Sequence, residues 1–104
     1  MKEEYEVIIQ PLALNTLQAI YDYIAEKLFN TDAAEKLINA FYEKFIDIRT
    51  FPKIYQVAKT QNLKREYRRC NVGNFAFFYT INEEDKVIYV SRIYYGRQDI
   101  ENQI

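Results

Sequence analysis

The spacing of the apolar residues changes at Pro52, and this change constrains the fold more than any other feature of the chain. Before Pro52, apolar residues recur every three or four positions in two runs, which is the period of one helical face. The runs are Leu14, Leu17, Ile20, Tyr21, Ile24 and Leu28, then Ala34, Leu37, Ile38, Phe41, Phe45 and Ile48. From residue 64 onward the pattern is that of extended strands. The chain is therefore predicted to contain a pair of helices followed by a sheet-forming segment.

Both helices have recognisable ends. The first is predicted over residues 11–29, with a proline in its first turn, where proline is favoured. Residues 30–32 break the pattern and offer several possible N-caps, of which Asp32 with Glu35 has the spacing of a capping box for the second helix. The second helix ends before Pro52, because the residue preceding a proline is disfavoured in the α region. With so short a connection, the helices should form an antiparallel hairpin.

Four strands are predicted around this hairpin. The β-branched run Tyr5–Ile9 precedes the first helix. A loop over residues 53–63 follows the second helix, and three strands come after it: Lys64–Val72, Phe75–Ile81 and Val87–Tyr95. Gly73-Asn74 supplies positive φ for the first turn between them, and Asn82–Lys86 forms the second.

The resulting order, β-α-α-β-β-β, fits a single domain over residues 1–104. We expect an α+β fold in which the helical hairpin packs on one face of a mostly antiparallel four-stranded sheet. The last strand is irregular, since Ile88 and Val90 share a face by alternation while Ile93 falls on the other. A bulge or strong twist near Ser91 would bring all three to the same face.

The residue inventory excludes the commonest catalytic and metal sites. One cysteine and no histidine allow neither an internal disulfide, nor a plausible zinc site, nor a Ser–His or Cys–His nucleophile. Cys70 is expected to be a small apolar strand residue, and we expect no metal and no cofactor. The chain has no apolar run near the ~20 residues that span a bilayer, and its first residues lack a signal-peptide pattern. We therefore expect a cytoplasmic protein without a membrane partner.

The net charge of −1 conceals an asymmetry. Residues 1–50 carry five Lys and Arg against nine Asp and Glu, whereas residues 51–104 carry nine against six. Five cations fall in one short segment: Lys59, Lys64, Arg65, Arg68 and Arg69. Such a segment is either a phosphate-binding surface or an ordinary solvated charged strand.

The chemistry that remains available depends on Arg, Lys and Tyr. Cleavage of RNA needs a base for the 2′-hydroxyl, cations around the phosphate and an acid for the leaving oxygen. The Arg fork binds two phosphate oxygens, and Lys or Tyr can act as base or acid where neighbouring cations lower the pKa. An exposed Tyr94 or Tyr95 could stack on unpaired bases. The same residue types also occur on plain protein-binding surfaces.

Short motifs occur in a particular order along the chain. They are Tyr5-Glu6-Val7, Ile20-Tyr21-Asp22-Tyr23-Ile24-Ala25, Ala33-Ala34, Phe51-Pro52, Tyr67-Arg68-Arg69, Val72-Gly73-Asn74-Phe75, Phe78-Tyr79 and Arg92-Ile93-Tyr94-Tyr95-Gly96-Arg97-Gln98-Asp99. In this order and spacing, over nearly its whole length, the chain resembles the RelE/ParE family of toxins from type II toxin–antitoxin systems.

The resemblance implies the β-α-α-β-β-β fold and a cognate antitoxin that wraps the toxin. RelE-like members cleave mRNA in the ribosomal A site without a metal, whereas ParE-like members poison DNA gyrase and have no known catalytic residues. The chain departs from the family pattern at Tyr95, where many relatives have His before Gly-Arg-Arg-Asp. It is also mildly acidic, while ribosome-directed members tend to be basic.

We favour a metal-independent, ribosome-dependent mRNA endoribonuclease. On this interpretation Arg68 and Arg92 would clamp the scissile phosphate, Lys64 or Lys59 would contact it or act as base, and Tyr95 would orient or protonate the substrate. Further RNA contacts are expected from Arg65, Arg69 and Arg97.

Two other functions stay open. The same basic strand and carboxy-terminal segment could dock on DNA gyrase without chemistry, or the chain could bind an antitoxin and have no toxicity. For the antitoxin we expect an amphipathic, acidic segment that covers the open face and edges of the sheet and neutralises the cations of residues 59–69.

Overall fold

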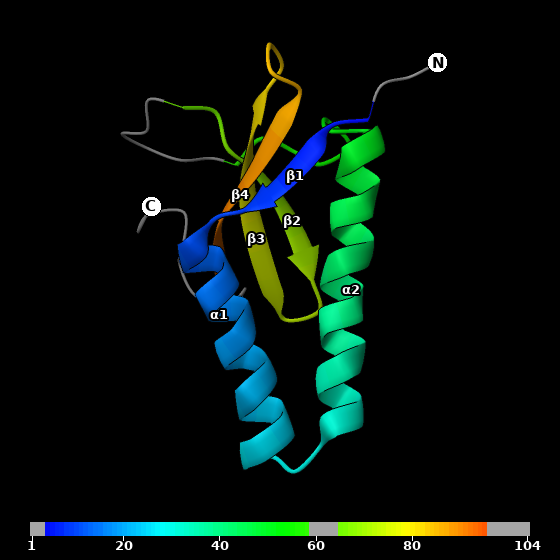
Figure 1. Cartoon of the computed structure of the whole chain (residues 1–104), viewed down its shortest axis with the longest axis vertical. Helices are drawn as coiled ribbons and strands as arrows, with labels where there is room; N and C mark the ends of the chain where they lie inside the picture. The colour runs from blue at the N-terminus through cyan, green and yellow to red at the C-terminus, as the bar shows by residue number, and fades with distance from the viewer. Residues whose placement is uncertain (1–3, 59–64, 96–104) are drawn as a thin grey trace.

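The computed structural model describes residues 4–58 and 65–95, which form a helical hairpin on one face of a four-stranded sheet (Figure 1). The strand order is β1-β4-β3-β2, with β1 parallel to β4 and the other neighbours antiparallel. The elements are β1 Glu6–Ile9, α1 Pro11–Asp22 with a π-helical continuation Tyr23–Lys27, α2 Thr31–Thr50, β2 Arg68–Val72, β3 Phe75–Asn82 and β4 Val87–Tyr95. The predicted fold class and element order are confirmed.

The core lies between the two helices and the sheet. Phe41 and Phe45 of α2 meet Phe77 of β3, with ring centroids 6.4 and 4.9 Å from it, and all three rings are buried. Burial of each such side chain stabilises the fold by on the order of 2 kcal/mol. In the part of the chain that the structure describes, no helix has the length and apolar character needed to cross a membrane.

The helix ends differ in detail from the sequence prediction. The predicted capping box of Asp32 and Glu35 is wrong, because α2 begins at Thr31, two residues before the start that a cap at Asp32 would give. Its cap is Asn30, whose side-chain oxygen accepts a hydrogen bond from the Ala33 N–H at 3.0 Å. The asparagine therefore satisfies one of the backbone donors that the first helical turn leaves unpaired.

The expected bulge in β4 is confirmed. The register between β3 and β4 shifts after Phe78, which pairs with Arg92, whereas Tyr79 pairs with Val90. Ser91 is the extra residue, and its hydroxyl donates to the Phe78 carbonyl at 3.4 Å. Because one inserted residue resets the alternation of a strand, Val90 and Ile93 are both buried toward the helices, and Arg92 faces the opposite side.

One strand prediction and one turn prediction need correction. The predicted strand Lys64–Val72 begins at Arg68 in the structure, since residues 65–67 are not in strand conformation and Lys64 lies outside the described residues. The turn between β2 and β3 was expected to use positive φ at Gly73-Asn74, but only Gly73 has it, with φ +58°. A positive φ at the first central residue alone is the requirement of a type II′ hairpin turn.

This turn generates a stability prediction. Gly73→Ala should lower the free energy of unfolding by about 1–2 kcal/mol, because a side chain disfavours left-handed backbone. A Cβ at this position would lie 3.9 Å from Leu37 Cδ1, an ordinary contact, so the cost is conformational and not steric. Urea denaturation of the variant measures it. The matched control is Asn74→Ala, which should change the value by less than about 0.5 kcal/mol; equal losses in both variants would contradict this account.

Candidate functional site

The face of the sheet turned away from the helices carries a cross-strand row of three residues. Arg69 of β2 pairs with Phe78 of β3, and Phe78 pairs with Arg92 of β4. Neighbouring strands are about 4.8 Å apart, so the two arginines start about 10 Å apart on either side of one aromatic ring. The guanidinium carbon of Arg69 lies 5.8 Å from the centre of the Phe78 ring. Arg92 is exposed, and within residues 4–58 and 65–95 it forms no ion pair.

Tyr94 and Asn71 complete what we call the open-face site: Arg69, Asn71, Phe78, Arg92 and Tyr94. The Tyr94 ring meets the Phe78 ring edge-on at 6.1 Å. The Asn71 side-chain oxygen accepts a hydrogen bond from Arg69 Nε at 3.1 Å. A cleft of about 410 Å³ adjoins these residues, lined by Arg69, Asn71 and residues 54–58. The site thus combines two cations, an amide and the half-buried Tyr94 ring over the buried Phe78 ring, and its Arg69 and Asn71 side borders a depression.

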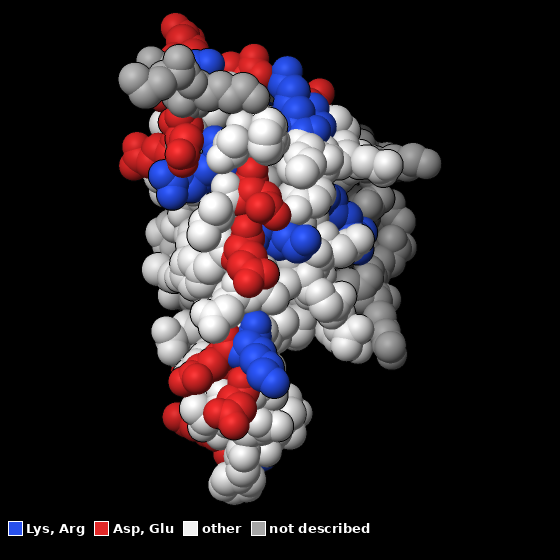
Figure 2. Space-filling model, turned by 90° about the vertical axis from the view of Figure 1, so that its right-hand side faces the viewer, with Lys and Arg blue, Asp and Glu red and all other residues white. Residues whose placement is uncertain are grey.

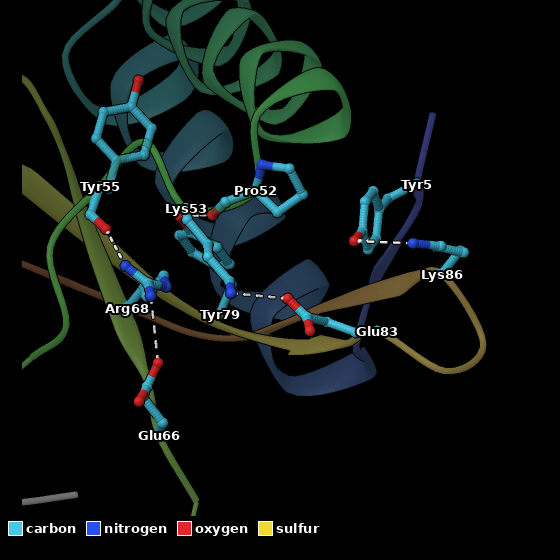
Figure 3. A network of polar contacts seen from close by, with 9 residues as sticks. All are labelled: Tyr5, Pro52, Lys53, Tyr55, Glu66, Arg68, Tyr79, Glu83 and Lys86. Carbon is cyan, nitrogen blue, oxygen red and sulfur yellow. Dashed lines mark hydrogen bonds and ion pairs between the residues drawn. The ribbon is translucent and has the colours of Figure 1, made fainter. Parts of the chain in front are cut away.

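Arg68 lies on the other face of the sheet, toward the helices. It pairs with Tyr79, and only 14% of its side chain is exposed. Its Nη1 donates to the Tyr55 carbonyl at 2.7 Å and its Nη2 to Glu66 Oε1 at 3.3 Å (Figure 3). Its Nε is buried without a hydrogen-bond partner among the described residues. This guanidinium is engaged within the protein and is not directed toward the open face.

Further polar contacts attach the segment after α2 to the sheet. The Tyr79 hydroxyl donates to the Pro52 carbonyl at 2.6 Å, and Lys53 Nζ lies 3.0 Å from Glu83 Oε1 (Figure 3). The hydrogen bond and charge of Lys53 lower the pKa of the exposed Glu83 carboxyl. Together with the Arg68–Tyr55 hydrogen bond, these contacts hold residues 52–55 over the helix-facing side of β2 and β3.

The buried titratable groups of this network are unsuited to proton transfer near neutral pH. Burial raises the pKa of Tyr79 to about 12 and that of the Cys70 thiol to about 11. Burial also raises the pKa of Tyr55. A general acid or base works best with a pKa near the operating pH, so these groups are structural. Cys70 is 1% exposed and packs in the main core, which confirms its predicted role.

Charges elsewhere on the described surface are mixed. Arg65 lines a cleft of about 640 Å³ together with Lys53 and Arg68, but three carboxylates line the same cleft: Glu66, Glu83 and Glu84. On the side of the molecule formed by α2, acidic and basic side chains are interspersed (Figure 2). Neither surface is a concentrated site for a phosphate.

The structure brings together only some of the predicted site residues. Arg69 and Arg92 share one face, whereas Arg68 and Arg92 lie on opposite faces, so the described geometry does not support their joint clamp on one phosphate. Tyr95 is on the helix-facing side, where its ring meets Phe75 at 5.7 Å. The other predicted contacts, Lys59, Lys64 and Arg97, lie outside the described residues.

Two open-face residues, Phe78 and Asn71, were missed by the sequence analysis, and Tyr94, which it named only as one of two possible base-stacking residues, lies on this face while Tyr95 does not. Two signals in the sequence could have indicated them. Arg69 and Asn71 alternate with the apolar Cys70 and Val72, which places the polar pair on the face away from the core. The bulge that was expected in β4 likewise reverses the faces of the residues that follow it.

The fold and the site together define a class: small α+β domains with a helical hairpin on one side of the sheet and two arginines over a buried aromatic ring on the other. Solved structures of toxin–antitoxin complexes contain this fold. The archaeal RelE–RelB complex from Pyrococcus horikoshii OT3 matches with 19% identity and a TM-score of 0.64, covering 91% of this chain and 98% of that one. The chromosomal ParDE system of P. aeruginosa matches with 17% identity and a TM-score of 0.68, covering 88% of this chain and 96% of that one. The RelBE2 complex of Mycobacterium tuberculosis matches with 16% identity and a TM-score of 0.62, covering 88% of this chain and 98% of that one.

At these identities the structural likeness shows the fold alone, and the sequence profile of a family decides membership. The profile of the ParE toxin of type II toxin–antitoxin systems, parDE, matches residues 7–100. The chain therefore belongs to the ParE toxin family of type II toxin–antitoxin systems. Among proteins of curated function, none matches the sequence significantly.

The buried thiol generates a prediction on pH. The usual pKa of the thiol is 9.0 and its native value is about 11, so between these values the unfolded chain loses a proton that the native protein keeps. The free energy of unfolding should fall as the pH rises through this window, by at most about 1.4 kcal/mol per pH unit for one group. Urea denaturation at a series of pH values measures the decline.

Cys70→Ala is the matched variant for this experiment. Its decline should begin about one pH unit higher than that of the wild type, because the phenols of Tyr79 and Tyr55, with a usual pKa of 10.0, ionise in the unfolded chain above the thiol's usual 9.0. Identical curves for the variant and the wild type between about pH 9 and 10 would show that the thiol does not contribute.

Proposed function

We propose that this toxin binds RNA through the open-face site and cleaves mRNA on the ribosome. The observation that supports this proposal most strongly is the row Arg69–Phe78–Arg92. Arg retains its charge at any physiological pH and offers a planar fork of donors to phosphate oxygens. Tyr94, at the rim of the same surface, could stack on a base that is not paired.

The proposed reaction is an attack of the 2′-hydroxyl oxygen on the adjacent phosphorus, with cleavage of the bond from phosphorus to the 5′ oxygen. A base accepts the proton of the 2′-hydroxyl, and an acid donates a proton to the leaving oxygen. Arg69 and Arg92 would stabilise the charge that develops on the phosphate oxygens. Tyr94 is our candidate on this face for orienting the substrate. The assignment of Lys59 or Lys64 as base remains a prediction from the sequence.

We also propose a cognate antitoxin as the partner of this chain. The three similar structures are of a RelE–RelB complex, a ParDE system and a RelBE2 toxin–antitoxin complex. In this chain, the cations of the open-face site would favour an acidic antitoxin segment. By covering Arg69 and Arg92, such a segment would exclude the RNA from the same surface.

A second candidate function is supported by the family itself. Its profile is that of the ParE toxin, and ParE-like toxins poison DNA gyrase without known catalytic residues. Within the described residues, Arg68 is withdrawn from the open face, which leaves a binding surface with fewer groups for chemistry. On this alternative the open-face site would contact gyrase or its DNA and perform no cleavage.

The deciding experiment maps RNA 5′ ends in bacteria shortly after induction of the toxin without antitoxin. The wild type should create new ends inside translated codons, and Arg92→Gln should reduce them by about 100-fold, as expected for loss of one donor that stabilises the transition state. Arg92 is exposed and without an ion pair in the described chain, so its loss should leave the fold intact. The matched control is Arg49→Gln, which removes an arginine of α2 that pairs with Glu4, away from the open-face site.

Growth arrest with intact mRNA would reject the nuclease proposal. Accumulation of gyrase–DNA cleavage complexes in the same cells would then establish the second candidate. If the wild-type chain neither cleaved mRNA nor trapped gyrase, and caused no arrest, both candidates would fail.

A further inference from the structure

We infer that Arg68 is a positioning residue that holds residues 55–58 along the outer edge of β2 and thereby sets one wall of the open-face site. This inference rests on the proposed function for its consequence, but its structural part stands on contacts within the chain. It assigns to Arg68 a role different from the phosphate contact that the sequence led us to expect.

The first step is the attachment of residues 55–58 to β2. The Tyr55 carbonyl accepts from Arg68 Nη1 at 2.7 Å. The next residues follow the strand edge: the Arg69 N–H donates to the Gln56 carbonyl at 3.0 Å, and the Ala58 N–H donates to the Tyr67 carbonyl at 2.7 Å. Val57 forms an isolated bridge with Arg68. The segment thus adds a short extra strand to the sheet, starting at the arginine side chain.

The second step is the passage of this segment from one face of the sheet to the other. Tyr55 contacts the main core on the helix-facing side, whereas Ala58 is 8% exposed and packs with Ala76 and Phe78 on the open face. Phe78 is the ring between the two arginines of the open-face site. The Arg68 side chain, on the helix-facing side, is therefore connected through the backbone of residues 55–58 to Phe78 on the open face.

The third step is the wall of the cleft beside Arg69. Residues 54–58 line that cleft opposite Arg69 and Asn71. If residues 55–58 moved from the edge of β2, the Arg69 N–H would lose its acceptor and Phe78 would lose part of its cover. The position of Arg69 toward a ligand would change, although Arg68 itself would not contact the ligand.

The donors of Arg68 explain why it is not itself a phosphate ligand. Nη1 is bonded to the Tyr55 carbonyl, Nη2 to the Glu66 carboxylate, and Nε is buried. A bidentate contact with phosphate needs two neighbouring N–H groups that reach the surface. With only 14% of its side chain exposed, Arg68 presents little of its guanidinium to the surface, and the part that lines the cleft beside Arg65 lies next to three carboxylates.

The salt dependence of RNA binding separates the two roles. The logarithm of the binding constant for single-stranded RNA falls with the logarithm of salt concentration, with a slope of about −0.7 per phosphate contact. The probe is a short, fluorescently labelled single-stranded RNA, titrated with the purified full-length toxin. Arg92→Gln should make the slope shallower by about 0.7, since it removes one contact.

Arg68→Gln should weaken binding about three- to tenfold at every salt concentration and leave the slope at the wild-type value, because no phosphate contact is lost. Arg49→Gln should change neither quantity. A slope that became shallower in Arg68→Gln by as much as in Arg92→Gln would overturn the inference and show a direct contact.

Amide hydrogen exchange provides a readout that does not depend on RNA. In Arg68→Gln, the amides of Ala58 and Arg69 should exchange about tenfold faster or more, and Arg92→Gln should leave them unchanged. Arg68→Lys, which can still donate to the Tyr55 carbonyl, should restore much of the protection, and it serves as the test if the Gln variant does not fold. Unchanged exchange at both amides would overturn the inference. If the wild type bound no RNA, the proposed function would fail, whereas the exchange result would still decide the role of Arg68.

Discussion

The extra residue at Ser91 in β4 is the constraint on which the two faces of this molecule depend. A strand of nine residues with regular alternation would bury either Ile88 and Val90 or Ile93, but not all three. With Ser91 as a bulge, all three pack under the helices, and the core of β4 is continuous. The same insertion places Arg92 opposite Phe78 on the open face. The packing of the core and the position of Arg92 are therefore decided by one residue.

The two faces of the sheet have distinct chemistry. On the helix-facing side, polar groups are engaged in short internal hydrogen bonds, such as those from Arg68 to the Tyr55 carbonyl and from Tyr79 to the Pro52 carbonyl. Such groups stabilise the segment between α2 and β2, because a buried donor or acceptor left unsatisfied costs about 1–3 kcal/mol. On the open side, Arg69 and Arg92 border a buried ring and a cleft. Arg68 and Arg69, adjacent in the sequence, thus lie on opposite faces of the sheet in different surroundings.

The main elements of the fold could be predicted because their signals are local. Helical spacing, Pro52 and the Gly73 turn each act over a few residues, and the order β-α-α-β-β-β follows from them. The errors also have local causes. Asn30, Thr31 and Asp32 are all good capping residues, and the choice of Asn30 depends on where the hairpin connection places the first turn of α2. The strand that precedes Gly73 was predicted to begin at Lys64, whereas β2 begins at Arg68. The charged residues before Arg68 have no strong preference for strand or loop conformation.

The candidate site was less predictable than the fold. The sequence indicated arginine, lysine and tyrosine chemistry in the right region, and the alternation of Arg68 with Cys70 and Val72 already placed Arg68 on the core side. The sequence analysis instead placed Arg68 on the scissile phosphate and gave Arg69 only a further RNA contact. Their difference in role becomes visible only when the partners of each guanidinium are known.

The sequence by itself determined the class of fold, the hairpin, the turn at Gly73 and the presence of an irregularity near Ser91, since each depends on residues close to one another in the chain. Only the tertiary structure decided that Arg69 and Arg92 flank Phe78, that Tyr95 packs on Phe75, and that Arg68 bonds to the Tyr55 carbonyl. These contacts join residues from separate elements, and their register follows from how helices and strands pack together. The two-residue turn at Gly73 sets the register of β2 on β3, but the contacts between other elements also depend on how the whole core is buried.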